Sequence, residues 1–295
     1  MSALASQIAM LRKQSGVAVE LPRSPVPEEL RRLLGIRTRL NLPLVGALPS
    51  ADRELPGVEI APGVLSLERL YHWDDVPDEV SARFADVAPA RARVANRERP
   101  RCGFGVIPRQ HLLHFDTETT GLSGGTGTRA FMIGAADWLG QSLRVRQLYL
   151  TTIAGETAML ETFASWLRPD TVLVSYNGRC YDSPLLATRY RLARMPNPMA
   201  GLRHLDLLFP VRRRFRGVWE NCRLATVERQ WLGVVREDDL PGSEAPRAWR
   251  DYLRGGSARD LRRVLAHNDQ DLRSLGALLL RMGETDDRLL EPEHQ

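Results

Sequence analysis

Two carboxylates stand at the end of an apolar stretch in the middle of the chain. Asp116 follows the run Leu-Leu-His-Phe, Thr117 separates it from Glu118, and small polar residues and Gly121 come next. In an extended strand alternate side chains share a face, so the two carboxylates would lie ~7 Å apart on one side of a sheet. A divalent cation would relieve their repulsion, and hard oxygen ligands suit magnesium or manganese. An ordinary strand-to-turn sequence is the alternative, so the interpretation depends on further acids.

The third candidate acid, Asp182, follows an apolar run at residues 171–174 and comes just before Pro184. A carboxylate in this place can cap the N-terminus of a helix. It also lies near the carboxyl end of a buried strand, where open sheets usually bind ligands. The residue type and position are compatible with both roles.

The fourth acid, Asp271, belongs to the last long periodic segment of the chain. His267 precedes it by four residues, so the two side chains share a helix face. Apolar residues on both sides of Asp271 indicate that it points near the core. A buried acid needs a partner, which could be a metal, Arg273 or a helix N-terminus.

The elements that would position these side chains follow from the hydrophobic pattern. Strands are predicted at residues 111–118, 131–138 and 143–151, with glycines in the connections, as a three-strand meander. A helix at 156–167 and a buried strand at 171–174 follow. The remaining periodic segments predict helices at 184–193, 224–232, 246–253 and 258–282. The expected fold is therefore α/β, with a mixed sheet, the meander plus parallel strands, flanked by helices.

The ends of the chain lie outside this pattern. Residues 1–109 are expected to form an irregular N-terminal extension, with a short helix at 2–14, one or two short strands within 57–70 and an arginine-rich connector at 83–109. Residues 284–295 are expected to be a C-terminal tail. The predicted functional domain accordingly spans residues 110–283.

Three motifs in the right order resemble a known family. They are Phe-Asp-Thr-Glu-Thr-Thr-Gly-Leu, then Tyr-Asn-Gly-x-x-Tyr-Asp-x-Pro-x-Leu, then His-Asn-x-x-Asp-Leu-x-Ser-Leu. This set resembles the DEDD 3′–5′ exonucleases of the ribonuclease H-like superfamily and, more narrowly, the bacterial YprB-type ribonuclease H-like domain. The resemblance covers about residues 110–283. Any one motif is weak, but each occurs in the strand or helix context that it requires.

The resemblance implies a site for two divalent ions, Mg²⁺ or Mn²⁺, held by four carboxylates. Asp116 would bridge both ions, Glu118 and Asp271 would complete the site of the attacking water, and Asp182 would support the second ion. Two such ions can activate water and stabilise the leaving 3′-oxygen during in-line attack on phosphorus. His267 would take the proton of the water, since an imidazole exchanges protons near neutral pH.

The spacing between His267 and Asp271 departs from the general pattern. In DEDD exonucleases with histidine the base usually lies five residues before the last aspartate, and the four-residue spacing is usually filled by tyrosine. Histidine at this spacing is typical of the YprB-type group. The four ligands are unaffected, whereas the identity of the base stays open.

Other residues are candidates for binding nucleic acid. Thr119 and Leu122 follow the first two acids and could contact the terminal nucleotide, and Asn177 matches a substrate-facing asparagine, with a turn-stabilising role as the alternative. We expect Asp206 to be structural. The adjacent Asp239, in the pair with Asp238, is expected at the surface.

An arginine-rich stretch at residues 211–219 interleaves Arg212, Arg213 and Arg214 with Phe215 and Trp219. Arginines can neutralise backbone phosphates, and aromatic faces can stack on unpaired bases. The stretch could therefore guide single-stranded nucleic acid toward the acids. The alternative is a solvated helix face with aromatic residues in the core.

Composition sets broad limits on these interpretations. The 295 residues carry a formal net charge of +5, but only one basic residue is lysine, so arginine usage itself is discounted as a sign of nucleic acid binding. Three cysteines without a Cys-x-x-Cys pair argue against a disulfide scaffold or a thiolate zinc site. Neither a signal peptide nor a long apolar run is evident, so we expect a soluble, cytoplasmic protein without membrane contact.

The expected function is a metal-dependent 3′–5′ exonuclease acting on a single-stranded 3′ end of DNA or RNA. A nucleic-acid-binding or interaction module with the same fold and little activity is one alternative. A structure-specific endonuclease using the same ions is another. The four acids favour an enzyme, because a protein without activity has no chemical reason to retain carboxylates that repel each other.

Overall fold

The computed structural model describes residues 50–85, 103–121 and 126–290, all within the compact unit Val45–Gln295. The expected helix at 2–14 and most of the arginine-rich connector lie outside these residues. Within the described part of the chain, none of the helices combines the length and the apolar character needed to span a membrane.

A seven-stranded sheet forms the centre of the domain, in the order β1-β2-β7-β6-β5-β8-β9. Its strands are β1 (Val58–Ala61), β2 (Val64–His72), β5 (Leu112–Thr119), β6 (Ala130–Leu139), β7 (Ser142–Leu150), β8 (Val172–Ser175) and β9 (Arg203–Asp206). The pairs from β1 to β5 are antiparallel, whereas β8 is parallel to β5 and β9 is parallel to β8. The predicted meander and mixed sheet are confirmed.

Two strands from before residue 110 belong to the same sheet. β2 pairs with β7 along its whole length, from Val64 opposite Leu150 to His72 opposite Ser142. The segment 57–70 is therefore an integral part of the sheet. A separate two-stranded sheet pairs β3 (Glu79–Ser81) with β4 (Val106–Pro108).

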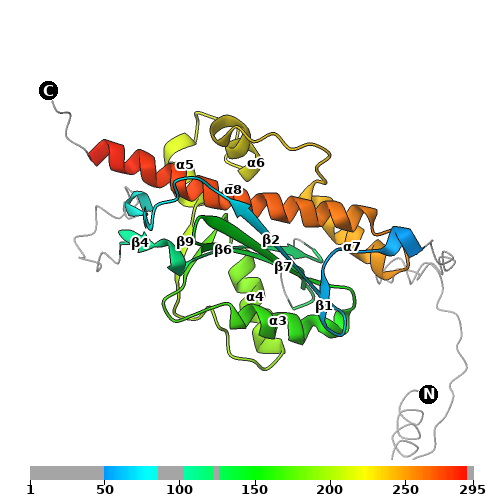
Figure 1. Ribbon diagram of the computed structural model, residues 1–295. Helices are drawn as coiled ribbons and strands as arrows, with labels where there is room; N and C mark the ends of the chain where they lie inside the picture. Colours follow the sequence, from blue (N-terminus) through cyan, green and yellow to red (C-terminus); the bar gives the residue numbers. More distant parts are fainter. Residues whose placement is uncertain (1–49, 86–102, 122–125, 291–295) are drawn as a thin grey trace, which may run out of the picture. The chain divides into compact units, whose positions relative to one another are not determined.

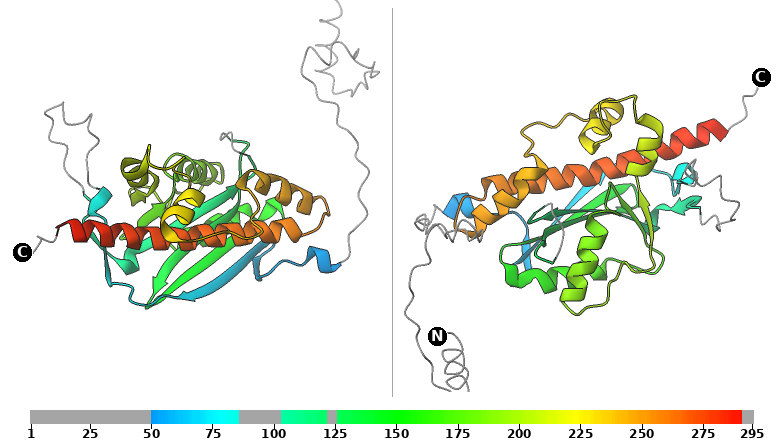
Figure 2. Two further views of the ribbon diagram at one scale, coloured as in Figure 1. Left: turned by 90° about the horizontal axis from the view of Figure 1, so that it is seen from above. Right: turned by 180° about the vertical axis from the view of Figure 1, so that it is seen from behind.

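Helices cover both faces of the large sheet. Figures 1 and 2 place α8 along one face, with α3 and α4 on the other. The helices are α3 (Glu156–Ser165), α4 (Asp182–Leu192), α5 (Leu208–Phe215), α6 (Leu224–Val227), α7 (Ala245–Leu253) and α8 (Arg259–Leu290). Short helical turns are η1 (Ser50–Arg53), η2 (Arg83–Ala85), η4 (Arg109–His111), η5 (Ile153–Gly155), η6 (Glu228–Leu232) and η7 (Gly242–Glu244).

Two helical predictions differ from the structure. The segment 224–232 is one turn of α-helix followed by a π-helical turn, η6, which ends at Gly233 with a positive φ of 70°. Helix α8 continues to Leu290, past the end of the predicted helix. A single π turn, closed by i→i+5 hydrogen bonds, is too short for apolar periodicity to distinguish it from an α turn.

Helix α8 carries the apolar stripe that fixes it on the sheet. Its fully buried side chains recur at helical spacing before and after a polar interruption: Leu261, Val264, Leu265, Leu272, Leu275, Leu278 and Leu279. Burial of one such side chain is worth up to about 1.5–3 kcal/mol, so the stripe holds the helix in one rotation. The interruption, residues 267–271, is thereby held over β5 and β6.

Candidate active site

Strand β5 extends beyond its parallel neighbour at the point where the first two acids stand. β8 pairs with β5 only as far as His114 opposite Val174, whereas β6 accompanies β5 further, with Asp116 opposite Gly134. One side of β5 is therefore free of strand pairing with β8 from residue 115 onward. Asp116 and Glu118 share the face that α8 covers, and Thr117 points to the opposite face.

A chain of buried amide groups orients Asp116. Asn268 of α8 is fully buried and donates Nδ2–H to Oδ2 of Asp116 at 2.9 Å. Its Oδ1 accepts a hydrogen bond from Nε2 of Gln147 on β7 at 2.9 Å, and Gln147 also reaches the carbonyl of Leu265. Both carboxamides are thus held in one orientation, which fixes one oxygen of Asp116 and leaves the other to the site.

Gly134 of β6 makes room for this contact. A Cβ atom at this position would lie 2.1 Å from Oδ1 of Asn268 and 2.8 Å from the side chain of Leu272. Neither Asn268 nor Gly134 was singled out in the sequence analysis. Asn268 could have been found as a polar residue within the apolar stripe of a predicted helix, because a buried carboxamide must have hydrogen-bond partners.

Asp182 is the first residue of α4, which lies on the face of the sheet opposite α8. Thr117 donates its hydroxyl to Oδ1 of Asp182, so the carboxylate is turned toward the α4 face of β5. Burial, opposed by this hydrogen bond, raises the pKa of Asp182 to about 6. The side chain is half-buried, and it lies near enough to the other acids for its charge to raise their pKa values.

The acids destabilise one another's charged forms. Burial raises the pKa of Asp116 well above its usual range, and the charges of Asp271, Asp182 and Glu118 raise it further. The pKa of Glu118, which is only 8% exposed, is raised by burial and by Asp271 and Asp182. Burial also raises the pKa of Asp271, although His267 and Arg236 act in the opposite direction. Burial and mutual repulsion thus outweigh the opposing charge of Arg236 at Glu118 and Asp271.

His267 is held by a carboxylate that we expected at the surface. Oδ1 of Asp239 lies 2.6 Å from Nδ1 of His267, and Nε2 of the ring lies 3.5 Å from Oδ2 of Asp271. Asp239 is partly buried, so the surface assignment was wrong; its neighbour Asp238 is the exposed member of the pair. No sequence pattern points to this contact, since it joins positions 28 apart.

Arg236 is the further charged group of the site that sequence analysis missed. Its guanidinium donates to Asp271 and to both carboxylate oxygens of Glu228. Burial opposes its charge, but the hydrogen bonds with Glu228 and the charge of Asp271 raise the pKa of Arg236, so it stays protonated. An arginine in a loop between helices has no periodicity that would single it out.

The carboxylate oxygens are the donors that magnesium and manganese prefer, and their raised pKa values are what an added cation would reverse. The donor set therefore fits divalent ions. In the described residues no three His, Cys, Asp or Glu side chains are grouped closely enough to hold an ion. The carboxylate of Asp182 is instead hydrogen-bonded to Thr117, and that of Asp271 to Arg236.

The residues predicted to bind the substrate differ from one another in their contacts. Thr119, at the end of β5, donates its hydroxyl to the carbonyl of Gly121 at 2.9 Å, and Leu122 lies outside the described residues. Asn177 has a positive φ of 67°, and its N–H donates to Asp206 at 2.7 Å. This geometry favours the turn-stabilising role of Asn177. Buried Asp206 also accepts the N–H groups of Arg179 and Leu208, as expected of a structural residue.

The arginine-rich stretch forms the end of α5. Arg212, Arg213 and Arg214 are exposed there. The aromatic rings are engaged with each other, since Phe215 stacks on Trp219 with ring centroids 3.7 Å apart. The guanidinium of Arg214 packs over Phe215 as well. Arg213 donates a hydrogen bond to the carbonyl of Phe84 at 2.6 Å, although its side chain is exposed. Stacking of Phe215 or Trp219 on bases would require the two rings to separate.

The chain is similar to a curated protein and, more distantly, to solved structures. A relative in Bacillus subtilis, the uncharacterized protein YprB, is 35% identical over 187 residues, which cover 63% of this chain and 44% of the relative. Among solved structures, a family B DNA polymerase from Pyrobaculum calidifontis matches 63% of this chain and 25% of its own, with 17% identity and a TM-score of 0.47. A complex of ExoI with SSB-Ct matches 53% of this chain and 43% of its own, with 17% identity and a TM-score of 0.35.

The sequence profile of the RNase H superfamily matches residues 113–282. This range begins in β5 and includes all four acids, His267 and Arg236. It covers more than half of the chain. The protein therefore belongs to the RNase H superfamily, with a region similar to YprB.

Proposed function

We propose that this domain is a divalent-metal-dependent nuclease that removes nucleotides from the 3′ end of single-stranded DNA or RNA. The observation that carries the proposal is the electrostatic cluster formed by Asp116, Glu118 and Asp271, with Asp182 beside it. Membership of the RNase H superfamily and the three ordered motifs support the same reading. The direction of digestion rests on the resemblance of those motifs to DEDD exonucleases.

The acids would hold Mg²⁺ or Mn²⁺ through their carboxylate oxygens. Bound ions would supply Lewis acidity, which lowers the pKa of water and stabilises a leaving 3′-oxygen. Asn268 fixes the orientation of Asp116 in this arrangement. Asp182 would have to rotate away from Thr117 to contribute an oxygen.

His267 is placed to accept a proton. Nδ1 of His267 lies 2.6 Å from Asp239, which only accepts hydrogen bonds, and 3.0 Å from Arg236, which only donates them. The shorter contact favours the tautomer with the proton on Nδ1, bonded to Asp239. The neutral ring then carries its lone pair on Nε2, which faces Asp271. Water attacking phosphorus would give its proton to Nε2 as the bond between phosphorus and the 3′-oxygen breaks and a nucleoside 5′-phosphate leaves.

The test is digestion of 5′-labelled single-stranded DNA and RNA with Mn²⁺, comparing the wild type with Asp116→Asn and Asp182→Asn. We expect a ladder of shortened products that EDTA and both substitutions abolish. Glu161→Gln is a matched control, since Glu161 is exposed on α3 away from the acids. Its activity should equal that of the wild type.

Two outcomes would replace the proposal with its alternatives. Cleavage of a closed circular single strand, which has no end, would indicate an endonuclease. Binding of both polymers without any cleavage, with Mn²⁺ or Mg²⁺ present, would indicate a binding module.

A further inference from the structure

Arg236 occupies a buried position beside the acids. Only 11% of its side chain is exposed. Nε and Nη2 donate to the two oxygens of Glu228, each at 2.7 Å, and Nη2 also donates to Oδ1 of Asp271. Nη1 lies 3.0 Å from Nδ1 of His267 and 3.6 Å from Oδ2 of Asp239. The guanidinium therefore joins the fourth acid and the imidazole to one anchor.

Glu228 is a rigid anchor for this arginine. Its side chain is 1% exposed and also accepts the hydroxyl proton of Ser274. Ser274 is itself buried and accepts a hydrogen bond from Nε2 of Gln270 at 2.9 Å. The geometry of two parallel charge-assisted hydrogen bonds resists rotation of the guanidinium.

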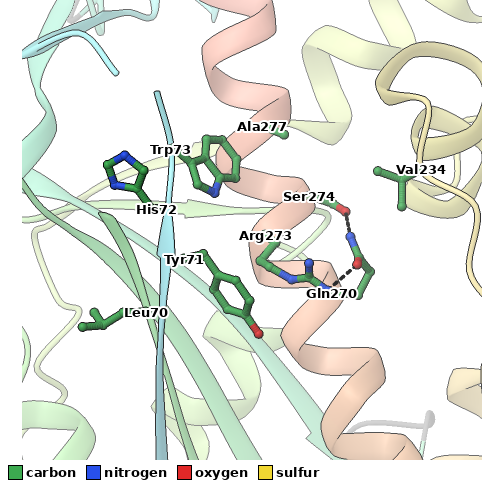
Figure 3. Close-up of a pocket in the computed structure, with 9 residues that line it drawn as sticks. All are labelled: Leu70, Tyr71, His72, Trp73, Val234, Gln270, Arg273, Ser274 and Ala277. Atoms are coloured by element: carbon green, nitrogen blue, oxygen red, sulfur yellow. Dashed lines mark hydrogen bonds between the residues drawn. The ribbon is translucent and has the colours of Figure 1, made fainter. Parts of the chain in front are cut away.

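Figure 3 shows the pocket beside Ser274, the residue of α8 that is bonded to Glu228. Gln270 and Ser274 line a pocket of about 330 Å³ on α8, and Tyr71 of β2 and Trp73, just after that strand, point toward the helix from the other side. Val234, two residues before Arg236, lines the same pocket. The hydrogen bonds from Arg236 to Asp271 and from Ser274 to Glu228 thus hold the loop that carries Arg236 against α8.

The two edges of the guanidinium have unequal partners. Glu228 holds Nε and Nη2 from a position where 1% of its side chain is exposed, whereas 15% of the Asp271 side chain is exposed and Asp271 belongs to the set expected to bind ions. An oxygen of Asp271 cannot serve the arginine and a divalent ion equally well. Because a cation at short range is repelled by a second cation, a bound ion and this contact oppose each other.

We propose that Arg236 is a resident cation that holds Asp271 when the site is free of metal, and that divalent ions bind only by displacing its guanidinium from Asp271. Arg236 then sets the metal affinity of the site. It remains bonded to Glu228 throughout. The inference rests on the proposed function, since it concerns the same acids.

The test measures Mn²⁺ binding to the full chain by isothermal titration calorimetry at pH 8. Arg236→Met alone would leave Glu228 buried without its charged partner, so the informative variant is Arg236→Met with Glu228→Gln, compared with Glu228→Gln alone. We expect the double variant to bind Mn²⁺ about tenfold more tightly, the scale of one lost charge-assisted hydrogen bond. Equal or weaker binding than Glu228→Gln would overturn the inference.

Arg263→Met is the matched control for removal of a positive charge. Arg263 also lies on the loop side of α8, but the carboxylates that it pairs with are those of Asp238 and Asp260, and it reaches Asp239 only at the backbone carbonyl. Its Mn²⁺ affinity should remain within about twofold of the wild type, as for a screened surface charge. A tenfold gain in this control would mean that net charge, and not the Asp271 contact, sets the affinity.

A crystal structure of the wild type with Mg²⁺ tests the same inference without substitution. Arg236 should be separated from Asp271 and still bonded to Glu228. A bound ion with the Arg236–Asp271 contact intact would overturn the inference and leave the proposed function standing. Absence of Mn²⁺ binding by the wild type would instead count against the proposed function itself.

Discussion

Asp239 and His267 form a carboxylate–imidazole pair, with Oδ1 of Asp239 2.6 Å from Nδ1 of the ring. The pair joins the loop before α7 to the middle of α8. Its chemical effect is on the other nitrogen, because donation of the Nδ1 proton leaves Nε2 unprotonated in the neutral ring. The carboxylate also favours the imidazolium that would form when Nε2 takes a proton.

Asp239→Ala should therefore reduce the rate of cleavage by about 10–100-fold, with His267→Ala reducing it by about 10²–10⁴-fold. Asp238→Ala is the matched control, since its side chain is exposed and pairs with Arg263. Single-turnover digestion of a 5′-labelled oligonucleotide measures all three. Equal losses for Asp238→Ala and Asp239→Ala would contradict an orienting role for Asp239.

Glu118→Gln should stabilise the metal-free protein. Burial and the other acids raise the pKa of Glu118, so its charge at pH 8 costs folding free energy that a neutral amide avoids. We expect a gain of about 1–2 kcal/mol, or roughly 2–8 °C in melting temperature, in EDTA. The same variant should lose the stabilisation that Mn²⁺ gives the wild type. Glu161→Gln, on the exposed face of α3, should change neither quantity.

Gly134→Ala should disconnect Asn268 from Asp116. The added Cβ would lie 2.1 Å from Oδ1 of Asn268, so the carboxamide must move. We expect a loss of about 1–3 kcal/mol in stability and a lower Mn²⁺ affinity. Gly276→Ala, on the same helix-to-sheet contact, is the control, because its Cβ would meet Leu143 at an acceptable 3.4 Å. Calorimetric Mn²⁺ titration of both variants separates a local effect on Asp116 from general loosening of α8.

Replacement of Arg212, Arg213 and Arg214 by alanine should flatten the salt dependence of single-strand binding. Three phosphate contacts contribute about 2 to the slope of log K against log salt concentration on a single strand. A matched triple variant replaces Arg247, Arg250 and Arg254, which are exposed at α7. Fluorescence anisotropy between about 50 and 200 mM salt gives the slopes. Identical slopes for the two triple variants would exclude α5 from the binding surface.

His204 should make the protein less stable in mild acid. Burial, aided by the charge of Arg179, lowers the pKa of His204 to about 4, from an ordinary value of about 6.5. Between these values the unfolded chain binds a proton and the folded chain does not, so stability falls as pH decreases from 6.5 to 4, by up to about 3 kcal/mol. His204→Gln should remove this contribution. Urea unfolding at several pH values measures the difference from the wild type, and a difference that is independent of pH would contradict it.

The fold could be predicted because its signals are local. Alternation in β5, β6 and β7 and the apolar stripe of α8 each fix an element from its own residues. The acids on β5 and α8 followed from the same patterns. The charges of Asp271 and Asp182 raise the pKa values of Asp116 and Glu118, whereas the role of the four acids in binding ions stays a prediction.

The remaining features depend on contacts between distant segments. Asp239 reaches His267, Arg236 reaches Glu228 and Asp271, and Gln147 reaches Asn268 only after the helices pack. The π turn of η6 and the inclusion of β2 in the sheet likewise depend on tertiary packing. Neither residue type nor spacing carries this information, because an arginine or aspartate in a loop is most often solvated.

The hydrogen bond between Asn268 and Asp116 joins positions 152 apart. A ribosome adds about 5–20 residues each second, so β5 is made roughly 8–30 s before the part of α8 that meets it. Until that helix docks, the strand acids have neither Asn268 nor Asp271 beside them. The site is therefore completed only after α8 has been synthesised, and a truncated product ending before α8 would have the strand acids without the means to use them.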